Sequence, residues 1–159
     1  MEYVLSALLF FVLVKLSIVL HELGHGLVYL VYTEGDLYLY VGDVPSDNFQ
    51  FRIGRIHFAF NHWLLRNTGG IDPLNHIVTR REGIMLYLAG PLMTLAIILT
   101  CTGLYYVFPK TIMSTALLYV AMINMYFLFF SLVPMTWYGG PMKGVKNDGT
   151  RIKELLAKS

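Results

Sequence analysis

Two long stretches of this chain contain no charged side chain. Residues 83–109 hold no Asp, Glu, Lys or Arg, and after Lys110 a second uncharged stretch runs from Thr111 to Met142. A helix of about 20 predominantly apolar residues is long enough to cross the hydrocarbon core of a bilayer. Both stretches exceed that length, so the chain is expected to fold in a membrane.

The composition of the whole chain agrees with a membrane protein and excludes several other classes. Of 159 residues, 56% are hydrophobic and 14% are charged, whereas soluble domains are roughly 45–50% apolar and about 25% charged. The formal charge of +2 is too small for a nucleic-acid-binding protein. Because Cys101 is the only cysteine, neither an intramolecular disulfide nor a Cys-rich zinc module is expected.

The polar residues divide a single domain, 1–159, into three apolar segments and a polar insert. The first segment is too long for a signal peptide and no small-residue cleavage site follows it, so a membrane helix is the better interpretation. The expected elements are membrane helices over about 3–33, 83–108 and 112–135, an insert over about 34–82, and a loop and tail over 136–159. The expected fold class is a membrane α-helical protein with three transmembrane helices.

The basic residues predict the orientation of these helices. Five arginines lie in the insert and five Lys or Arg residues lie in the tail, whereas the linker between the second and third segments holds only Lys110. Cytoplasmic loops of membrane proteins carry an excess of Lys and Arg. We therefore expect the insert and the C-terminus in the cytoplasm and the N-terminus outside.

The insert is the only part of the chain with strand patterns. One strand is expected over Asp36–Val41, and within Asn48–Asn61 the apolar alternation changes phase at Gly54-Arg55. A two-residue type II′ turn with Gly54 at its first central position explains this change and predicts a hairpin, while a bulge at Gly54 is the alternative. The expected cross-strand pairs are Ile53 with Ile56, Phe51 with Phe58, and Phe49 with Phe60.

The apolar face of this hairpin has two interpretations. Either the face rests on the membrane surface, or the hairpin offers a sheet edge to an extended peptide. In the second case the residues expected to contact a substrate are Phe51, Ile53, Ile56 and Phe58.

Two histidines and a glutamate stand together in the first segment, as His21-Glu22-Leu23-Gly24-His25. On a helix His21 and His25 project from the same face and can bind one zinc ion through their imidazoles. In zinc hydrolases with this pattern the glutamate acts as a general base and does not bind the metal. Core histidines and a Glu22–Lys15 pair are the alternative, but such groups are costly in a membrane helix without a metal or an aqueous cavity.

Three other residues of the first segment fit the same interpretation. Gly24 and Gly26 have no side chain, which suits a site that another backbone or a substrate approaches closely. Lys15, seven residues before Glu22, either lines a hydrated cavity that leads to the site, or extends toward the headgroups or lines a contact between helices.

A catalytic zinc site needs a third protein ligand and one open position. In the third segment and the tail, the only acidic candidates are Asp148 and Glu154, and Asp148 stands beside a glycine at a chain reversal. Asp148 could instead cap a short amphipathic helix over Thr150–Lys158. Rival ligands in the insert, whose spacing matches no common zinc pattern, are His57, His62 and His76.

Together these residues resemble the site-2 protease family of intramembrane zinc metalloproteases, in a minimal three-helix form. The resemblance is carried by His21-Glu22-Leu23-Gly24-His25, Ala89-Gly90-Pro91, Asn124, Pro134, Asp148-Gly149 and the following Thr150-Arg151-Ile152. It implies that His21, His25 and Asp148 bind one zinc ion, that Glu22 is the catalytic base, and that the insert is a membrane-associated β structure that orients substrate. We therefore expect a multi-pass protein of a prokaryotic cell membrane that hydrolyses peptide bonds in or near the transmembrane segment of its substrates.

The chain departs from the family pattern at two places. Many members place an Asn three residues before the conserved proline, where this chain has Ser131. Ser131 and Asn124 are therefore the candidate polar contacts to the substrate. The interval from Pro134 to Asp148 is also longer than in the common form, and its extra length, Met135–Asn147, forms either a flexible lid or a loop that carries Asp148 back to the membrane.

Two other classes of protein compete with a protease. A non-proteolytic zinc-binding membrane protein would use the metal to hold three helices together, but a structural site has four protein ligands and needs no acid beside them. A small channel or transporter subunit with a polar path through Lys15, Glu22 and Asn124 would hold no tightly bound metal. A protease, by contrast, needs Glu22 as its general base, so it is the preferred hypothesis. The expected partners of this protease are one Zn²⁺ ion, the lipid bilayer and a transmembrane protein or peptide substrate.

Overall fold

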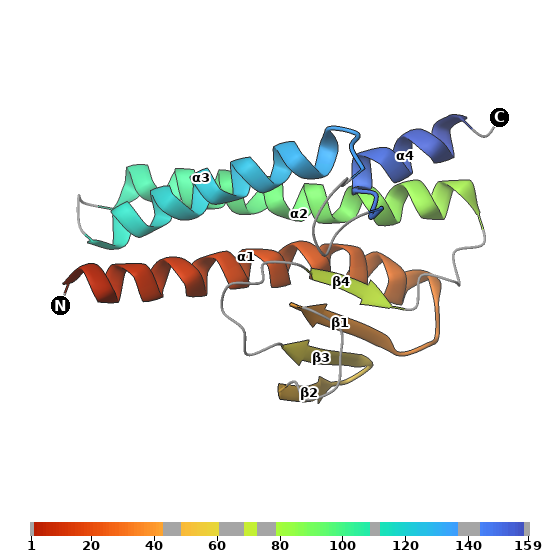
Figure 1. The fold of residues 1–159 in the computed structure, drawn as a ribbon, viewed down its shortest axis with the longest axis horizontal. Helices are drawn as coiled ribbons and strands as arrows, with labels where there is room; N and C mark the ends of the chain where they lie inside the picture. Colours follow the sequence, from red (N-terminus) through yellow and green to blue (C-terminus); the bar gives the residue numbers. More distant parts are fainter. Residues whose placement is uncertain are drawn as a thin grey trace.

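The computed structural model describes residues 2–42, 49–60, 69–72, 79–108, 112–136 and 144–157. The elements in chain order are α1 Glu2–Tyr32, β1 Leu37–Val41, β2 Phe49–Ile53, β3 Ile56–Phe60, β4 Gly69–Asp72, α2 Arg80–Val107, α3 Ile112–Leu132 and α4 Asp148–Ala157. Helices α1, α2 and α3 run alongside one another, α4 lies beyond the end of α3, and the sheet lies on the other side of α1 (Figure 1).

Among the described residues, three helices are long and apolar enough to cross a membrane, in agreement with the three apolar segments. Helix α2 begins at Arg80 rather than at Gly83, because Thr79 and Glu82 form a capping box. The Glu82 amide donates to Thr79 Oγ1 at 3.3 Å, and the Thr79 amide donates to Glu82 Oε2 at 3.0 Å. Helix α3 ends at Leu132, shortly before Pro134, because a proline disfavours helical backbone in the residue before it.

Two glycines of α1 stand where neighbouring elements approach closely, as expected. A Cβ atom added to Gly24 would lie 2.6 Å from the Ala89 carbonyl oxygen of α2. A Cβ atom added to Gly26 would lie 2.5 Å from Leu37 Cδ2 of β1. The glycines therefore let α2 pack on one side of α1 and the sheet on another.

The hairpin forms with the register that the alternation predicts. β2 and β3 are antiparallel, with Ile53 opposite Ile56, Phe51 opposite Phe58 and Phe49 opposite Phe60. Gly54 has a φ angle of 58°. In the described part of the chain only glycines have a positive φ, so the next residue, Arg55, does not. A positive φ at the first central residue alone is the signature of a type II′ turn, so no bulge is needed.

The sheet has four strands in the order β2-β3-β1-β4. β1 pairs parallel with β3 and antiparallel with β4, and it buries Leu37, Leu39 and Val41 in a core shared with α1. Strand β4 was not expected, because Gly69-Gly70-Ile71-Asp72 has no apolar alternation and forms a strand through its pairing with β1. This pairing places β4 beside α1. A Cβ atom added to Gly69 would lie 2.6 Å from Ile18 Cγ2 and 2.9 Å from Glu22 Cγ, so the strand packs closely on the helix there.

Candidate metal and catalytic site

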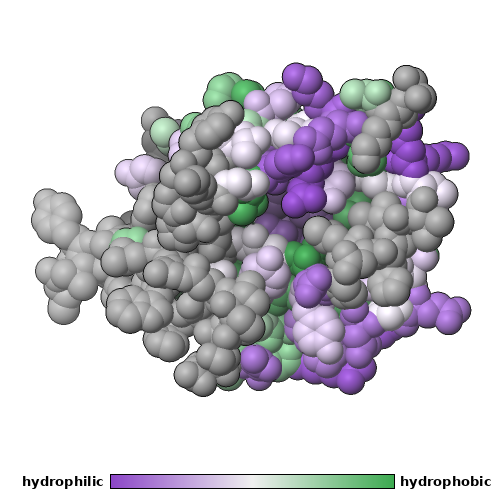
Figure 2. Space-filling model, turned by 45° about the vertical axis from the view of Figure 1, so that its right-hand side comes forward, coloured by the Kyte–Doolittle hydropathy of each residue, from purple (hydrophilic) through white to green (hydrophobic). Residues whose placement is uncertain are grey.

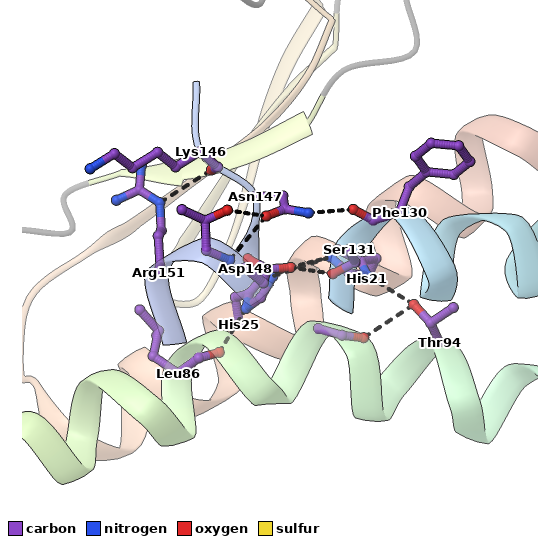
Figure 3. A network of polar contacts seen from close by, with 12 residues as sticks. His21, His25, Leu86, Thr94, Phe130, Ser131, Lys146, Asn147, Asp148 and Arg151 are labelled. Carbon is purple, nitrogen blue, oxygen red and sulfur yellow. Dashed lines mark hydrogen bonds and ion pairs between the residues drawn. The ribbon is translucent and has the colours of Figure 1, made fainter. Parts of the chain in front are cut away.

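His21 and His25 of α1 meet Asp148 of α4 in a compact group (Figure 3). The Asp148 Oδ2 atom lies 3.3 Å from His21 Nε2 and 3.5 Å from His25 Nε2, and the two Nε2 atoms are 3.2 Å apart. One ligand atom from each residue lies within 4.8 Å of the others, so the group could hold a metal ion.

The Nδ1 atoms of both histidines bind groups on α2. His25 Nδ1 donates to the Leu86 carbonyl oxygen at 2.7 Å. His21 Nδ1 lies 2.8 Å from Thr94 Oγ1, and the Thr94 hydroxyl itself donates to the Gly90 carbonyl oxygen at 3.1 Å. Since the Thr94 proton is used in that bond, its oxygen accepts from His21 Nδ1. Both Nδ1 atoms are therefore engaged with α2, and both Nε2 atoms face the group, which is the arrangement of metal-binding histidines.

Gly90 keeps space open at the two candidate ligand nitrogens. A Cβ atom added to Gly90 would overlap His25 Nε2 and would lie 2.5 Å from His25 Cε1 and 2.8 Å from His21 Nε2. Any larger residue at this position of α2 would therefore occupy the space toward which both rings point.

Asn147 positions Asp148 by capping α4 and joining it to the end of α3. Its Oδ1 accepts from the Thr150 amide at 3.0 Å, as an N-cap does, and its Nδ2 donates to the Phe130 and Val133 carbonyl oxygens at 2.6 Å each. The capping role considered for Asp148 therefore belongs to Asn147. Asp148, the first residue of α4, is left to face the histidines.

The Asp148 carboxylate is held ionised by its neighbours. Burial alone would raise its pKa, but hydrogen bonds from His21 and His25 and the charges of these rings outweigh burial and lower the pKa below its usual range. Ser131 Oγ also donates to Asp148 Oδ2 at 2.5 Å. The other acidic candidate, Glu154, pairs instead with Lys146 at 2.6 Å on the exposed side of α4.

Glu22 shares a cavity of about 300 Å³ with the three metal-ligand candidates. Within the described part of the chain, no hydrogen bond reaches its carboxylate. Strand β4 supplies part of the cavity wall, and Tyr87 of α2 and Phe130 of α3 supply other parts. Figure 2 shows a recess bordered by hydrophilic residues on the side of the molecule that carries α4.

The residues expected to contact the substrate are only partly brought to this cavity. Ser131 lines it, but Asn124 is fully buried away from it, where its Nδ2 donates to Ser17 Oγ at 2.8 Å and to the Val120 carbonyl oxygen at 2.9 Å. Lys15 does not line the cavity either. The same holds for the expected hairpin contacts, which are Phe51, Ile53, Ile56 and Phe58.

The rival ligands do not join the group where the structure describes them. His57 lies 3.1 Å from Asp36 Oδ2 and stacks on Tyr38 with 4.5 Å between the ring centroids. His62 and His76 lie outside the described residues, as does the middle of the loop between Pro134 and Asp148. The ends of this loop meet, because the Asn147 amide donates to the Met135 carbonyl oxygen at 3.4 Å. The loop therefore returns Asp148 to the helices.

Sequence patterns alone did not reveal two residues that support this group. Thr94 is a single hydroxyl in an apolar stretch, and the only available signal was its position one helical turn after Gly90. Asn147 had a stronger signal, since Asn is a preferred residue immediately before a helix. The next residue, Asp148, is an equally preferred cap type, so residue type alone does not separate the two.

No protein-family model, no curated protein and no solved structure matches this chain. The inference about its function therefore rests on the chemistry and geometry of the site.

Proposed function

We propose that this chain is an intramembrane zinc metalloprotease of the site-2 protease type. The observation that carries the proposal is the meeting of His21 and His25, on a helix of membrane-spanning length, with Asp148 of α4, beside a Glu22 carboxylate that no described residue binds by a hydrogen bond. Ionisable groups inside a membrane are costly and usually functional.

The donor atoms fit zinc in a catalytic rather than a structural role. Two imidazole nitrogens and one carboxylate are typical zinc ligands. Within the residues that the structure describes, no fourth His, Cys, Asp or Glu joins the group. Three protein ligands with an open position characterise catalytic zinc, whereas structural zinc has four. The space preserved by Gly90 at the ligand nitrogens supports the same fit.

The proposed chemistry divides between the metal and Glu22. A zinc ion held by His21, His25 and Asp148 would supply Lewis acidity, which polarises a carbonyl and lowers the pKa of water toward about 7. Glu22 lies in the same cavity with its carboxylate free of hydrogen bonds from described residues. It would accept the proton of the attacking water on a carboxylate oxygen and then pass this proton to the nitrogen of the leaving amine.

Strand β4 offers a place for an unwound substrate. Among the described strands β4 forms one edge of the sheet, and Gly69, Gly70 and Ile71 line the cavity. A substrate helix must unwind before hydrolysis, and an extended segment added to this edge would have its backbone groups satisfied within the membrane. The edge beside the cavity is β4 rather than the hairpin strand β2, which forms the opposite edge.

The substitution Glu22→Gln tests this function. We expect the purified variant to retain its zinc, because Glu22 is not among the metal-ligand candidates, and to lose cleavage of membrane-spanning peptides, because the general base is gone. Zinc content by elemental analysis and product formation by mass spectrometry measure the two properties.

The matched control is Glu34→Gln, an exposed glutamate shortly after α1. This variant should retain both zinc and cleavage. Wild-type protein without metal, or undiminished cleavage by Glu22→Gln, would contradict the proposed function.

A further inference from the structure

Two adjacent glycines of β4 shape the cavity wall that faces Glu22. A Cβ atom added to Gly69 would lie 2.9 Å from Glu22 Cγ and 3.0 Å from Glu22 Oε1, so this glycine lets the strand lie against the glutamate. Successive residues of a strand face opposite sides of the sheet. Gly70 therefore opens the other side, where an added Cβ would overlap the Tyr40 hydroxyl and lie 2.5 Å from Tyr40 Cζ.

The space above Gly70 is filled by the side chain of Tyr40. Tyr40 stands opposite Gly70 in the β1–β4 pairing, and its ring reaches across the strand because Gly70 has no side chain. The phenol thereby reaches the wall of the cavity that contains Glu22 and the metal-ligand candidates. A tyrosine on β1, one strand away from the sheet edge, thus reaches the proposed active site.

The hydroxyl of Tyr40 makes no hydrogen bond with any described residue. Burial, together with the negative charges of Glu22 and Asp72, raises the pKa of this phenol. The group therefore stays protonated at neutral pH and can donate a hydrogen bond.

Four other polar side chains that line the described part of the cavity are engaged with partners. Ser131 donates to Asp148, and Lys146 is held by Glu154. Arg151 donates to the Tyr87 hydroxyl at 3.2 Å, and Asn147 donates to carbonyl oxygens at the end of α3. Tyr40 is thus a side-chain donor that lines the same cavity as Glu22 and is not held by any described residue.

Peptide hydrolysis places a negative charge on the carbonyl oxygen of the scissile bond, and a preorganised donor aimed at that oxygen accelerates the reaction. We propose that the Tyr40 hydroxyl donates a hydrogen bond to the scissile carbonyl oxygen as its negative charge develops, which makes Tyr40 a catalytic residue. This inference rests on the proposed protease function. It adds a role for the sheet in the chemistry, beyond its pairing with substrate.

The substitution Tyr40→Phe removes this hydroxyl and leaves the ring. Loss of one oxyanion donor lowers kcat by about 100-fold or more, so we expect a loss of that size with little change in KM or zinc content. The matched control is Tyr38→Phe on the same strand. Tyr38 is 51% exposed, stacks on His57 and does not line the cavity, so its variant should cleave at the wild-type rate.

The substitution Gly70→Ala tests the same role from the neighbouring strand. The added Cβ must displace the Tyr40 phenol, so a comparable loss of kcat is expected. Because both changes remove one donor, the double variant Gly70→Ala/Tyr40→Phe should lose no more activity than Tyr40→Phe alone. Fully additive losses would overturn the assignment.

A phosphinic peptide, whose phosphorus oxygens imitate the oxyanion, gives a readout that does not require turnover. Zinc-loaded Tyr40→Phe should bind it about 100-fold more weakly than zinc-loaded wild type. Wild-type kcat and phosphinic affinity in Tyr40→Phe, or loss of zinc from this variant, would overturn the role of Tyr40. Failure of wild-type protein to cleave peptides and to bind the phosphinic peptide would instead overturn the protease function, and the role of Tyr40 with it.

Discussion

The β2–β3 hairpin is formed by residues that are close together in the sequence, whereas the His21–His25–Asp148 group is formed by residues that are far apart. The hairpin pairs residues on either side of one turn, and its strand β2 is exposed, with Phe49 at 71% and Ile53 at 62%. The group joins His21 to Asp148 and to Thr94, which are 127 and 73 positions away along the chain. A single added methyl group should therefore disturb the group far more than the hairpin.

Gly90→Ala should have the largest effect. The new Cβ would overlap His25 Nε2 and lie 2.8 Å from His21 Nε2, so zinc binding should fall below detection in elemental analysis of the purified protein. Gly103→Ala in the same helix is the control, because an added Cβ there meets nothing within 4 Å. It should bind zinc normally and gain roughly 0.5–1 kcal/mol of stability. Equal zinc content in the two variants would show that the space at Gly90 is not needed for zinc binding.

Asp148→Ala should come next, because it removes one of the three ligand candidates and leaves both histidines. We expect zinc affinity, measured by competition with a chelator, to fall more than 100-fold. This loss is larger than the one expected when a residue that only orients a ligand is removed. Glu154→Gln on the same helix should bind zinc normally, since Glu154 pairs with Lys146. Full zinc occupancy in Asp148→Ala would assign the third ligand elsewhere, for example to a histidine of the insert.

Thr94→Val should have an intermediate effect. Valine keeps the shape of the buried side chain but cannot accept the hydrogen bond from His21 Nδ1. Loss of a partner that orients a ligand typically lowers metal affinity about 10–100-fold. Thr94→Ser should restore most of the affinity in the same chelator competition, because it restores the acceptor. Equal affinities for the serine and valine variants would show that the bond does not orient His21.

Gly54→Ala should have the smallest effect on the site. An added Cβ meets nothing within 4 Å, but the φ angle of 58° is unfavourable for alanine. We expect a loss of about 1–2 kcal/mol in the free energy of unfolding, with unchanged zinc affinity. A large loss of zinc affinity would mean that the hairpin and the metal group are coupled, and that the comparison between them fails.

This comparison also explains which features could be predicted from the sequence. The hairpin register follows from alternation and one glycine, and His21, Glu22 and His25 follow from helical spacing, because both depend on neighbours along the chain. Strand β4, the contact of Thr94 with His21 and the reach of Tyr40 across Gly70 depend on segments that meet only after folding. No local pattern marks them. Asn147 lies between these cases, since its residue type suits a helix cap but its bonds to the end of α3 are long-range.

In the proposed site, two imidazoles and one carboxylate hold a single zinc ion, and one position is left open. Zinc-edge X-ray absorption of the purified protein in lipid tests it most directly. We expect one zinc per chain, with nitrogen and oxygen neighbours at about 2.0–2.2 Å and multiple-scattering features from two imidazoles. A protein that binds no zinc, or a zinc with sulfur ligands or with three or more imidazoles, would contradict the account.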